Sequence, residues 1–184
     1  MAHELISKDY RYRGKVLDLS VSRFQSLAKG EVAIEVVHHN GGAGAIPLFE
    51  NGDVALVRQW RYPLGRYSLE ICAGRIEPGQ NPEETAAREL EEELGLRAHK
   101  LERIAEFNVA PGYCEERIYV YLATELETSA QNLDDDEEID IVRMPLASAL
   151  EHVRSGEIDD AKSIVGLRTL ADLLNGQWPV ASSQ

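Results

Sequence analysis

Three glutamates, Glu89, Glu92 and Glu93, have a spacing that brings them to one side of a helix. Like charges at such helical neighbours cost roughly 0.2 to 0.5 kcal/mol per pair, and carboxylates near a helix C-terminus also oppose the helix dipole. A hard divalent cation, which binds carboxylate oxygens and water, would offset this repulsion. Arg88 can pair with Glu84 or Glu92, four residues away on either side. The spacing therefore favours a metal site, and a solvated acidic helix face is the alternative left open.

The glutamates lie in the clearest predicted helix of the chain, Pro82–Leu94. Asn81 is a good N-cap, Pro82 suits the first helical position, and Glu84 can complete a capping box. Gly95 can end the helix in the left-handed conformation. The apolar residues of this segment share a neighbouring arc, so the helix is predicted to pack on a core while it presents its glutamates.

Short β-like runs dominate the sequence before this helix and return after it. The Asn51-Gly52 pair is a strong hairpin signal, and an antiparallel sheet is expected from the strands around it. The expected strands are 16–24, 31–38, 45–49, 54–60, 67–73, 101–109, 117–123 and 139–144, and two further helices are expected at 146–153 and 163–174. Helices packed on a sheet give an α+β fold.

Composition and charge exclude several classes of protein. The chain has 184 residues, a hydrophobic content of 43% and a net charge of −13, which is typical of a folded domain. Most of the charge lies in two acidic blocks, 77–93 and 134–140, and such a surface disfavours nucleic acid and anionic membranes. Cys72 and Cys114 show no disulfide or zinc spacing. Without a signal peptide or a membrane-spanning run, a cytoplasmic location is expected.

The acidic helix resembles the Nudix box, a motif that defines a family of hydrolases. The matching residues are Gly74, Arg88-Glu89-Leu90, Glu92-Glu93, Gly95 and Leu96. One position departs, because Gln80 stands where the box has its first Glu, and this change bears on metal number or subgroup. Further segments look like the branch that hydrolyses ADP-ribose and nucleoside diphosphate sugars; they are 57–63, 69–74, 110–112 and 156–162.

This resemblance implies a fold and an assembly. The expected fold is a Nudix-type α/β/α sandwich with a mixed sheet and an N-terminal antiparallel β subdomain. Residues 1–40 would form that N-terminal strand region and 41–184 the Nudix hydrolase domain. In this branch the N-terminal strands commonly build a homodimer whose subunits share each substrate site, so a homodimer is expected.

The resemblance also implies a metal site. Glu89 and Glu93 would be the main ligands of Mg²⁺, with Mn²⁺ as the alternative ion. Glu92 would be a further ligand or would orient the attacking water, and the main-chain carbonyl of Ala73 would complete the site. The expected activity is hydrolysis of the pyrophosphate bond of ADP-ribose or a related sugar such as GDP-mannose, giving a nucleoside monophosphate and a sugar phosphate.

In this branch a glutamate from the loop before the strand at 139–144 acts as general base. Glu137 is the first choice for this role, with Glu138 and Asp135 next. A mobile acidic loop that closes on substrate would suit the composition of this segment. Taken alone, the acidic run is more typical of a solvated loop.

An anionic substrate in an acidic protein needs cations near its phosphates. Arg58, Arg61 and Arg66 cluster near the site strand, with Arg61 the best phosphate or ribose contact, although each can equally form a surface ion pair. Trp60 can stack a base or serve in packing.

Glu70 and Glu116 match family positions that line the substrate pocket. Two other functions remain open: hydrolysis of nucleoside triphosphates or dinucleotides on the same fold, and a non-catalytic nucleotide-sugar-binding module. The latter predicts loss of a carboxylate from the box, yet Glu89, Glu92 and Glu93 are all present.

Overall fold

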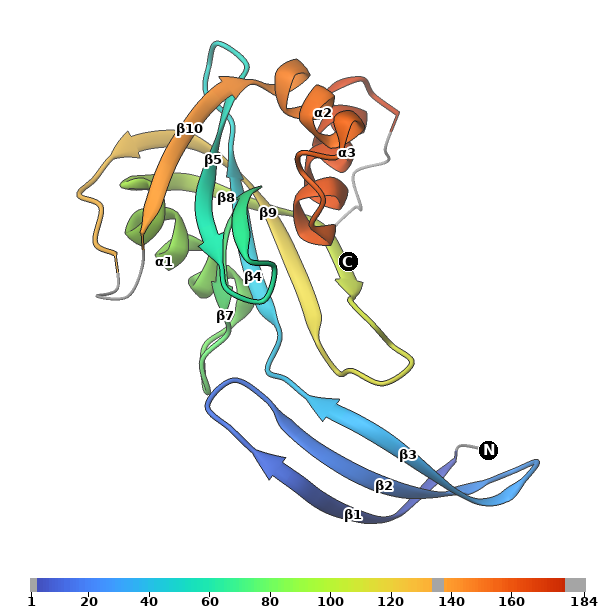
Figure 1. Ribbon diagram of the computed structural model, residues 1–184. Coiled ribbons are helices and arrows are strands. Elements are labelled where there is room, and N and C mark those ends of the chain that lie inside the picture. The colour runs from blue at the N-terminus through green and yellow to red at the C-terminus, as the bar shows by residue number, and fades with distance from the viewer. Residues whose placement is uncertain (1–2, 134–137, 178–184) are drawn as a thin grey trace. The chain divides into compact units, whose positions relative to one another are not determined.

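The computed structural model describes residues 3–133 and 138–177, and the chain divides into two compact units (Figure 1). The first unit comprises Met1–Gly41 and Phe107–Arg117, and the second comprises Gly42–Glu106 and Ile118–Gln184. The division predicted at residue 40 did not include the segment Phe107–Arg117. None of the helices within the described ranges has the length and hydrophobicity needed to cross a bilayer.

The first unit is built on a three-stranded antiparallel sheet of order β1-β2-β3. Its strands are β1 (Glu4–Arg13), β2 (Asp18–Ser26) and β3 (Gly30–His38). The segment at 107–117 attaches to β3 through main-chain hydrogen bonds, in which Val37 donates to Tyr113 O (2.7 Å) and accepts from Glu115 N–H (3.0 Å). The strand β1 was not predicted from the sequence, and all its residues are exposed, so no buried apolar alternation marks it.

The second unit contains two sheets. One has four strands in the order β7-β4-β9-β8, namely β7 (Cys72–Arg75), β4 (Gly42–Pro47), β9 (Arg117–Thr128) and β8 (Leu96–Asn108). It is a mixed sheet, because β4 is parallel to β9 and antiparallel to β7. The other has three antiparallel strands, β10 (Ile139–Pro145), β5 (Asp53–Arg61) and β6 (Arg66–Glu70).

Helices α1 (Pro82–Leu94), α2 (Leu146–Ser155) and α3 (Ala161–Leu174) cover these sheets. Ala86 and Leu90 of α1 are fully buried in the core cluster that includes alternate residues of β4. On the other face of β4, α3 packs so closely that a Cβ on Gly166 would lie 2.9 Å from Ile46 Cδ1. Figure 1 shows α1 on one side of the strands and α2 with α3 on the other. The predicted α/β/α sandwich is confirmed.

Two expected features of the sheets are wrong. The turn at Asn51-Gly52 forms, with Gly52 at φ +83°, but the flanking strands share only the bridge between Leu48 and Val54 and then enter different sheets. The single strand expected at 67–73 is broken between β6 and β7. At the break, the Ile71 N–H donates to Ser163 Oγ (2.8 Å) rather than to a neighbouring strand.

Candidate active site

The helix α1 begins and ends as its sequence predicts. Asn81 Oδ1 accepts a hydrogen bond from Glu84 N–H (2.8 Å), and the Glu84 carboxylate accepts one from Asn81 N–H (3.1 Å). This capping box satisfies two of the main-chain donors that every helix N-terminus leaves without a helical partner. Gly95 closes the other end at φ +62°. Local contacts therefore define both ends of α1, and the three glutamates lie within its regular turns.

Glu89 and Glu93 are buried beside β7. Only 8% of Glu89 and 3% of Glu93 are exposed, and Glu93 Oε2 accepts a hydrogen bond from Ala73 N–H (3.2 Å). Gly74 makes room for Glu89, because a Cβ at this position would lie 1.7 Å from Glu89 Oε1. The glycine of the motif thus permits a carboxylate to lie directly against the main chain of β7.

Arg88 links two of these glutamates. Its guanidinium contacts Glu89 Oε1 (2.7 Å) and Glu92 Oε2 (2.5 Å). Burial alone would lower the Arg88 pKa, but these two carboxylates raise it above its usual value. The alternative pairing with Glu84 does not form, because Glu84 is held in the capping box.

A cleft of about 430 Å³ lies over this end of β7 and the exposed side of α1. It is lined by Ala73, Gly74, Arg75, Glu77, Arg88, Glu89 and Glu92. The structure thus brings Glu89, Glu92 and Ala73 to one cleft, together with two arginines. Carboxylate and carbonyl oxygens suit a hard divalent cation, and Gly74 leaves space beside one of them. Across residues 3–133 and 138–177, however, no three His, Cys, Asp or Glu side chains are already arranged to hold a metal ion.

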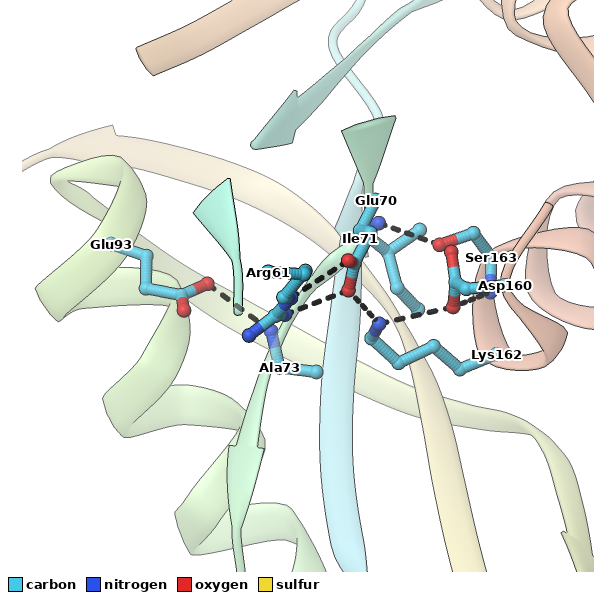
Figure 2. A network of polar contacts seen from close by, with 8 residues as sticks. All are labelled: Arg61, Glu70, Ile71, Ala73, Glu93, Asp160, Lys162 and Ser163. Carbon is cyan, nitrogen blue, oxygen red and sulfur yellow. Dashed lines mark hydrogen bonds and ion pairs between the residues drawn. The ribbon is translucent and has the colours of Figure 1, made fainter. Parts of the chain in front are cut away.

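Arg61 and the buried Glu70 form a partly buried ion pair with two parallel hydrogen bonds (Figure 2). Arg61 Nε donates to Glu70 Oε1 (2.8 Å) and Arg61 Nη2 donates to Glu70 Oε2 (2.7 Å). Lys162 Nζ contacts the same Glu70 oxygen and also Asp160 Oδ2 (3.0 Å). Although burial raises the pKa of Glu70, the hydrogen bonds and charges of Arg61 and Lys162 lower it to about 2. Glu70 is therefore a fixed anion that orients both cations.

The start of α3 anchors this network. Asp160 Oδ2 caps the helix by accepting from Ser163 N–H (3.1 Å), and Ser163 Oγ accepts from Ile71 N–H (2.8 Å). Sequence reasoning assigned no role to Asp160 or Lys162. They lie within 156–162, a segment that matches the family, but only the fold shows that this segment meets Glu70.

The other two site arginines and Trp60 gather around Tyr67 and neighbouring strands. Arg58 stacks over the Tyr67 ring (4.4 Å to its centroid) and lies 3.6 Å from Asp140. Trp60 meets the same ring edge-on, with a centroid separation of 5.3 Å. Arg66 pairs with Asp159, at the loop before α3. Arg58, Trp60 and Arg66 are therefore close to one another but already have partners.

The remaining predicted residues lie elsewhere in the chain. Glu116 belongs to the first unit, where it lies 3.7 Å from His39. Glu138 is exposed and directly precedes β10, whose first residue pairs with Gln59 of β5. Glu137, the first choice for general base, and Asp135 lie outside the described residues.

Comparisons with known proteins agree with this fold and site. A family model described as the NUDIX domain matches residues 38–165. The ADP-ribose pyrophosphatase of Bacillus subtilis (strain 168) is 38% identical over 92% of this chain and 93% of its own length. A GDP-mannose pyrophosphatase of Cronobacter sakazakii is 34% identical over 73% of this chain and 75% of its own length. A crystal structure of an ADP compounds hydrolase superposes with a TM-score of 0.84, covers 96% of both chains and shares 22% identity.

The chain therefore belongs to the Nudix family. It is a Nudix hydrolase. Nudix ADP-ribose pyrophosphatases generally use a divalent metal ion, which is consistent with the oxygen donors that line the cleft beside β7.

Proposed function

We propose that this protein is a Mg²⁺-dependent pyrophosphatase that splits ADP-ribose, or a related nucleoside diphosphate sugar such as GDP-mannose, into a nucleoside monophosphate and a sugar phosphate. The observation that carries the proposal is the cleft beside Gly74 of β7, which is lined by the carboxylates of Glu89 and Glu92 and by two arginines. Relatives named for these two activities support the substrate class. Mn²⁺ is the alternative ion.

In this proposal the chain supplies ligands of two kinds. Glu89, Glu93 and the Ala73 carbonyl would hold the metal, with Glu92 as a further ligand or as the group that orients water. A bound divalent ion would screen the phosphate charges and acidify a coordinated water. Glu89 and Glu93 suit this role because both are buried against β7, which limits the conformations that their carboxylates can adopt.

The general base is proposed to come from the acidic loop before β10. Glu137 remains the first choice and Glu138 the second. The register of β10 supports this assignment, because its first residue, Ile139, pairs with Gln59, two residues from Arg61. A carboxylate there can accept a proton from water attacking the pyrophosphate.

Substrate binding is assigned to the residues near the Arg61 end of β5. Glu70 holds the Arg61 guanidinium in one orientation through two hydrogen bonds, which prepares Arg61 to bind a phosphate or ribose without loss of side-chain freedom. Arg58 and Trp60 would contact the nucleotide beside it, with Tyr67 under the Arg58 guanidinium and edge-on to Trp60. Glu116 is retained as a proposed pocket residue of the first unit.

We also propose a homodimer formed through residues 1–40, with 41–184 as the hydrolase domain. β1 is exposed along its length, and the first unit exposes large apolar side chains that a second copy could cover. They include Leu5, Ile6, Tyr12, Val16 and Leu27. The cytoplasm is the proposed location, where Cys72 and Cys114 would stay thiols.

A substrate panel tests the proposed activity. The protein is incubated with Mg²⁺ or Mn²⁺ and ADP-ribose, ADP-glucose, GDP-mannose, UDP-glucose, NADH or nucleoside triphosphates, and the products are identified by mass spectrometry. We expect metal-dependent release of a monophosphate and a sugar phosphate. Preference for triphosphates or NADH would support the second enzymatic function, and binding without turnover of any compound would support the non-catalytic module.

A pair of variants tests the metal ligands. Glu93→Gln removes a buried carboxylate charge and is expected to lower kcat at least a hundredfold, since metal-bound groups dominate catalysis in such sites. Glu83→Gln, on the exposed first turn of the same helix, is the matched control and keeps full activity. Equal activity of the two variants would remove Glu93 from the site.

A further inference from the structure

The C-terminal turn of α1 carries an unusual charge pattern. All of this helix is described, and it has no basic residue in its last turn, where Glu91, Glu92 and Glu93 stand in succession. The final carbonyl groups of a helix lack helical donors and form the negative end of its dipole. Three carboxylates there would destabilise the turn unless other donors reach those carbonyls.

A segment from elsewhere in the chain supplies these donors. Residues 129–132, which follow β9, run across the end of α1 and donate to two of its carbonyls and to the carbonyl of its C-cap, Gly95. Ser129 N–H donates to Gly95 O (2.7 Å), Asn132 N–H to Glu92 O (3.0 Å) and Gln131 Nε2 to Glu93 O (2.7 Å). Two of the three acceptors belong to the proposed metal ligands themselves.

The contact is close and extends to a side chain of the turn. A Cβ on Gly95 would lie 3.1 Å from Ser129 O and 3.2 Å from Gln131 N, so the segment is seated directly on the end of the helix. Ser129 Oγ also donates to Glu91 Oε1 (2.7 Å), and Arg97 contacts the same oxygen. Glu91 is thereby tied to this segment, away from the cleft that Glu89 and Glu92 line.

We propose that residues 129–132 form a clamp that sets the orientation of Glu92 and Glu93 for metal binding, and that Gln131 is its principal positioning residue. The proposal rests on the proposed metal-dependent function. Gln131 is the one member of the clamp that holds a main-chain carbonyl of a proposed ligand through a side chain, so it can be changed without altering the main-chain donors. Groups that orient metal ligands typically affect metal affinity about tenfold or more.

Two substitutions separate positioning from simple charge effects. Gln131→Met keeps the length of the side chain but loses the donor, and we expect the dissociation constant for Mn²⁺ to rise about threefold to tenfold. Gln131→Glu also loses the donor but adds a negative charge. A through-space effect would tighten Mn²⁺ binding in this variant, whereas loss of the clamp weakens it, so the two explanations predict opposite signs.

The measurement is Mn²⁺ titration followed by electron paramagnetic resonance, without substrate, at a temperature where every variant is folded. Gln177→Met is the matched control, because it makes the same substitution at an exposed residue after α3, outside the clamp, and its Mn²⁺ affinity should be unchanged. In turnover assays Gln131→Met should need more metal for half-activation while kcat at saturating metal stays within about twofold.

The possible failures are distinguishable. If the unmodified protein binds no Mn²⁺ and shows no turnover, the proposed function itself fails. If it binds Mn²⁺ but Gln131→Met binds equally well, or Gln131→Glu binds more tightly, the clamp is wrong and the function stands. Amide hydrogen exchange at the end of α1 gives a check independent of metal, because Gln131→Met should exchange faster there than Gln177→Met.

Discussion

The buried Glu70 carboxylate makes the stability of the fold depend on pH in a way that can be calculated. Its side chain is 4% exposed and pairs with Arg61 and Lys162, and its pKa is lowered from 4.5 to about 2. A lowered pKa contributes stability that is present above the unfolded value and lost as the pH falls toward the folded value. Since one pKa unit corresponds to about 1.36 kcal/mol, the contribution is about 3 kcal/mol at neutral pH.

Glu70→Gln removes this contribution and leaves the partly exposed Arg61 without its carboxylate partner, while Lys162 keeps its contact with Asp160. Loss of one partner from a fully buried ion pair typically costs about 3 to 5 kcal/mol, so we expect a destabilisation at the lower end of this range, about 3 kcal/mol, at pH 7. Between pH 4.5 and 2 the difference between the two proteins should shrink by about 1.4 kcal/mol per pH unit, because the natural protein loses its advantage while the variant has none to lose.

Urea unfolding of both proteins at pH 7, 5, 4 and 3.5 measures this difference directly. Glu50→Gln, an exposed glutamate of the turn before β5, makes the same charge change and should follow the natural protein at every pH. A difference between Glu70→Gln and the natural protein that stays constant from pH 5 to 3.5 would falsify the assignment of Glu70 as a buried anion with a lowered pKa.

Three further predictions concern the acidic helix and the loop before β10. Gly74→Ala should abolish turnover by displacing Glu89, whose Oε1 lies 1.7 Å from the added Cβ position. Normal activity of this variant would mean that α1 and β7 can move apart without loss of function. Asn81→Ala removes the N-cap of α1 and should lower the free energy of unfolding in urea by about 1 kcal/mol. An unchanged free energy would mean that solvent replaces the cap. Glu137→Gln should lower kcat more than KM, measured with ADP-ribose, and if Glu138→Gln alone does so the base is Glu138.

Local signals in the sequence were sufficient for α1 and its turn residues. The N-cap Asn81, the capping-box Glu84 and the closing Gly95 act within a few residues of one another, so the bounds Pro82–Leu94 follow from short-range chemistry. The same is true of the turn at Asn51-Gly52. The expected antiparallel pairing across that turn does not form, because β4 pairs with β7 and β9, which are distant in sequence. Burial of β4 on both faces favours a central position in the sheet.

The site divides in the same way. The motif gave Glu89, Glu92, Glu93 and Gly74, since these residues are tied to one helix and the strand before it. The roles of Lys162 and Asp160 require α3 to lie beside the break between β6 and β7, and no local pattern specifies that contact. Sequence resemblance marked their segment as typical of the family, but the ion pair with Glu70 is a property of the fold.

The structure also changes the physical argument for a metal. From the sequence, the acidic block at 77–93 contains one basic residue, and this composition favours a bound cation. In the fold, arginines outside the helix meet it, because Arg75 pairs with Glu77 and Arg97 pairs with Glu91, while Glu93 accepts from a main-chain N–H. Much of the repulsion is therefore relieved by the chain itself. The case for a metal accordingly rests on the oxygen-lined cleft at Gly74 and on family membership, so metal titration of Glu93→Gln tests it more directly than salt dependence of stability.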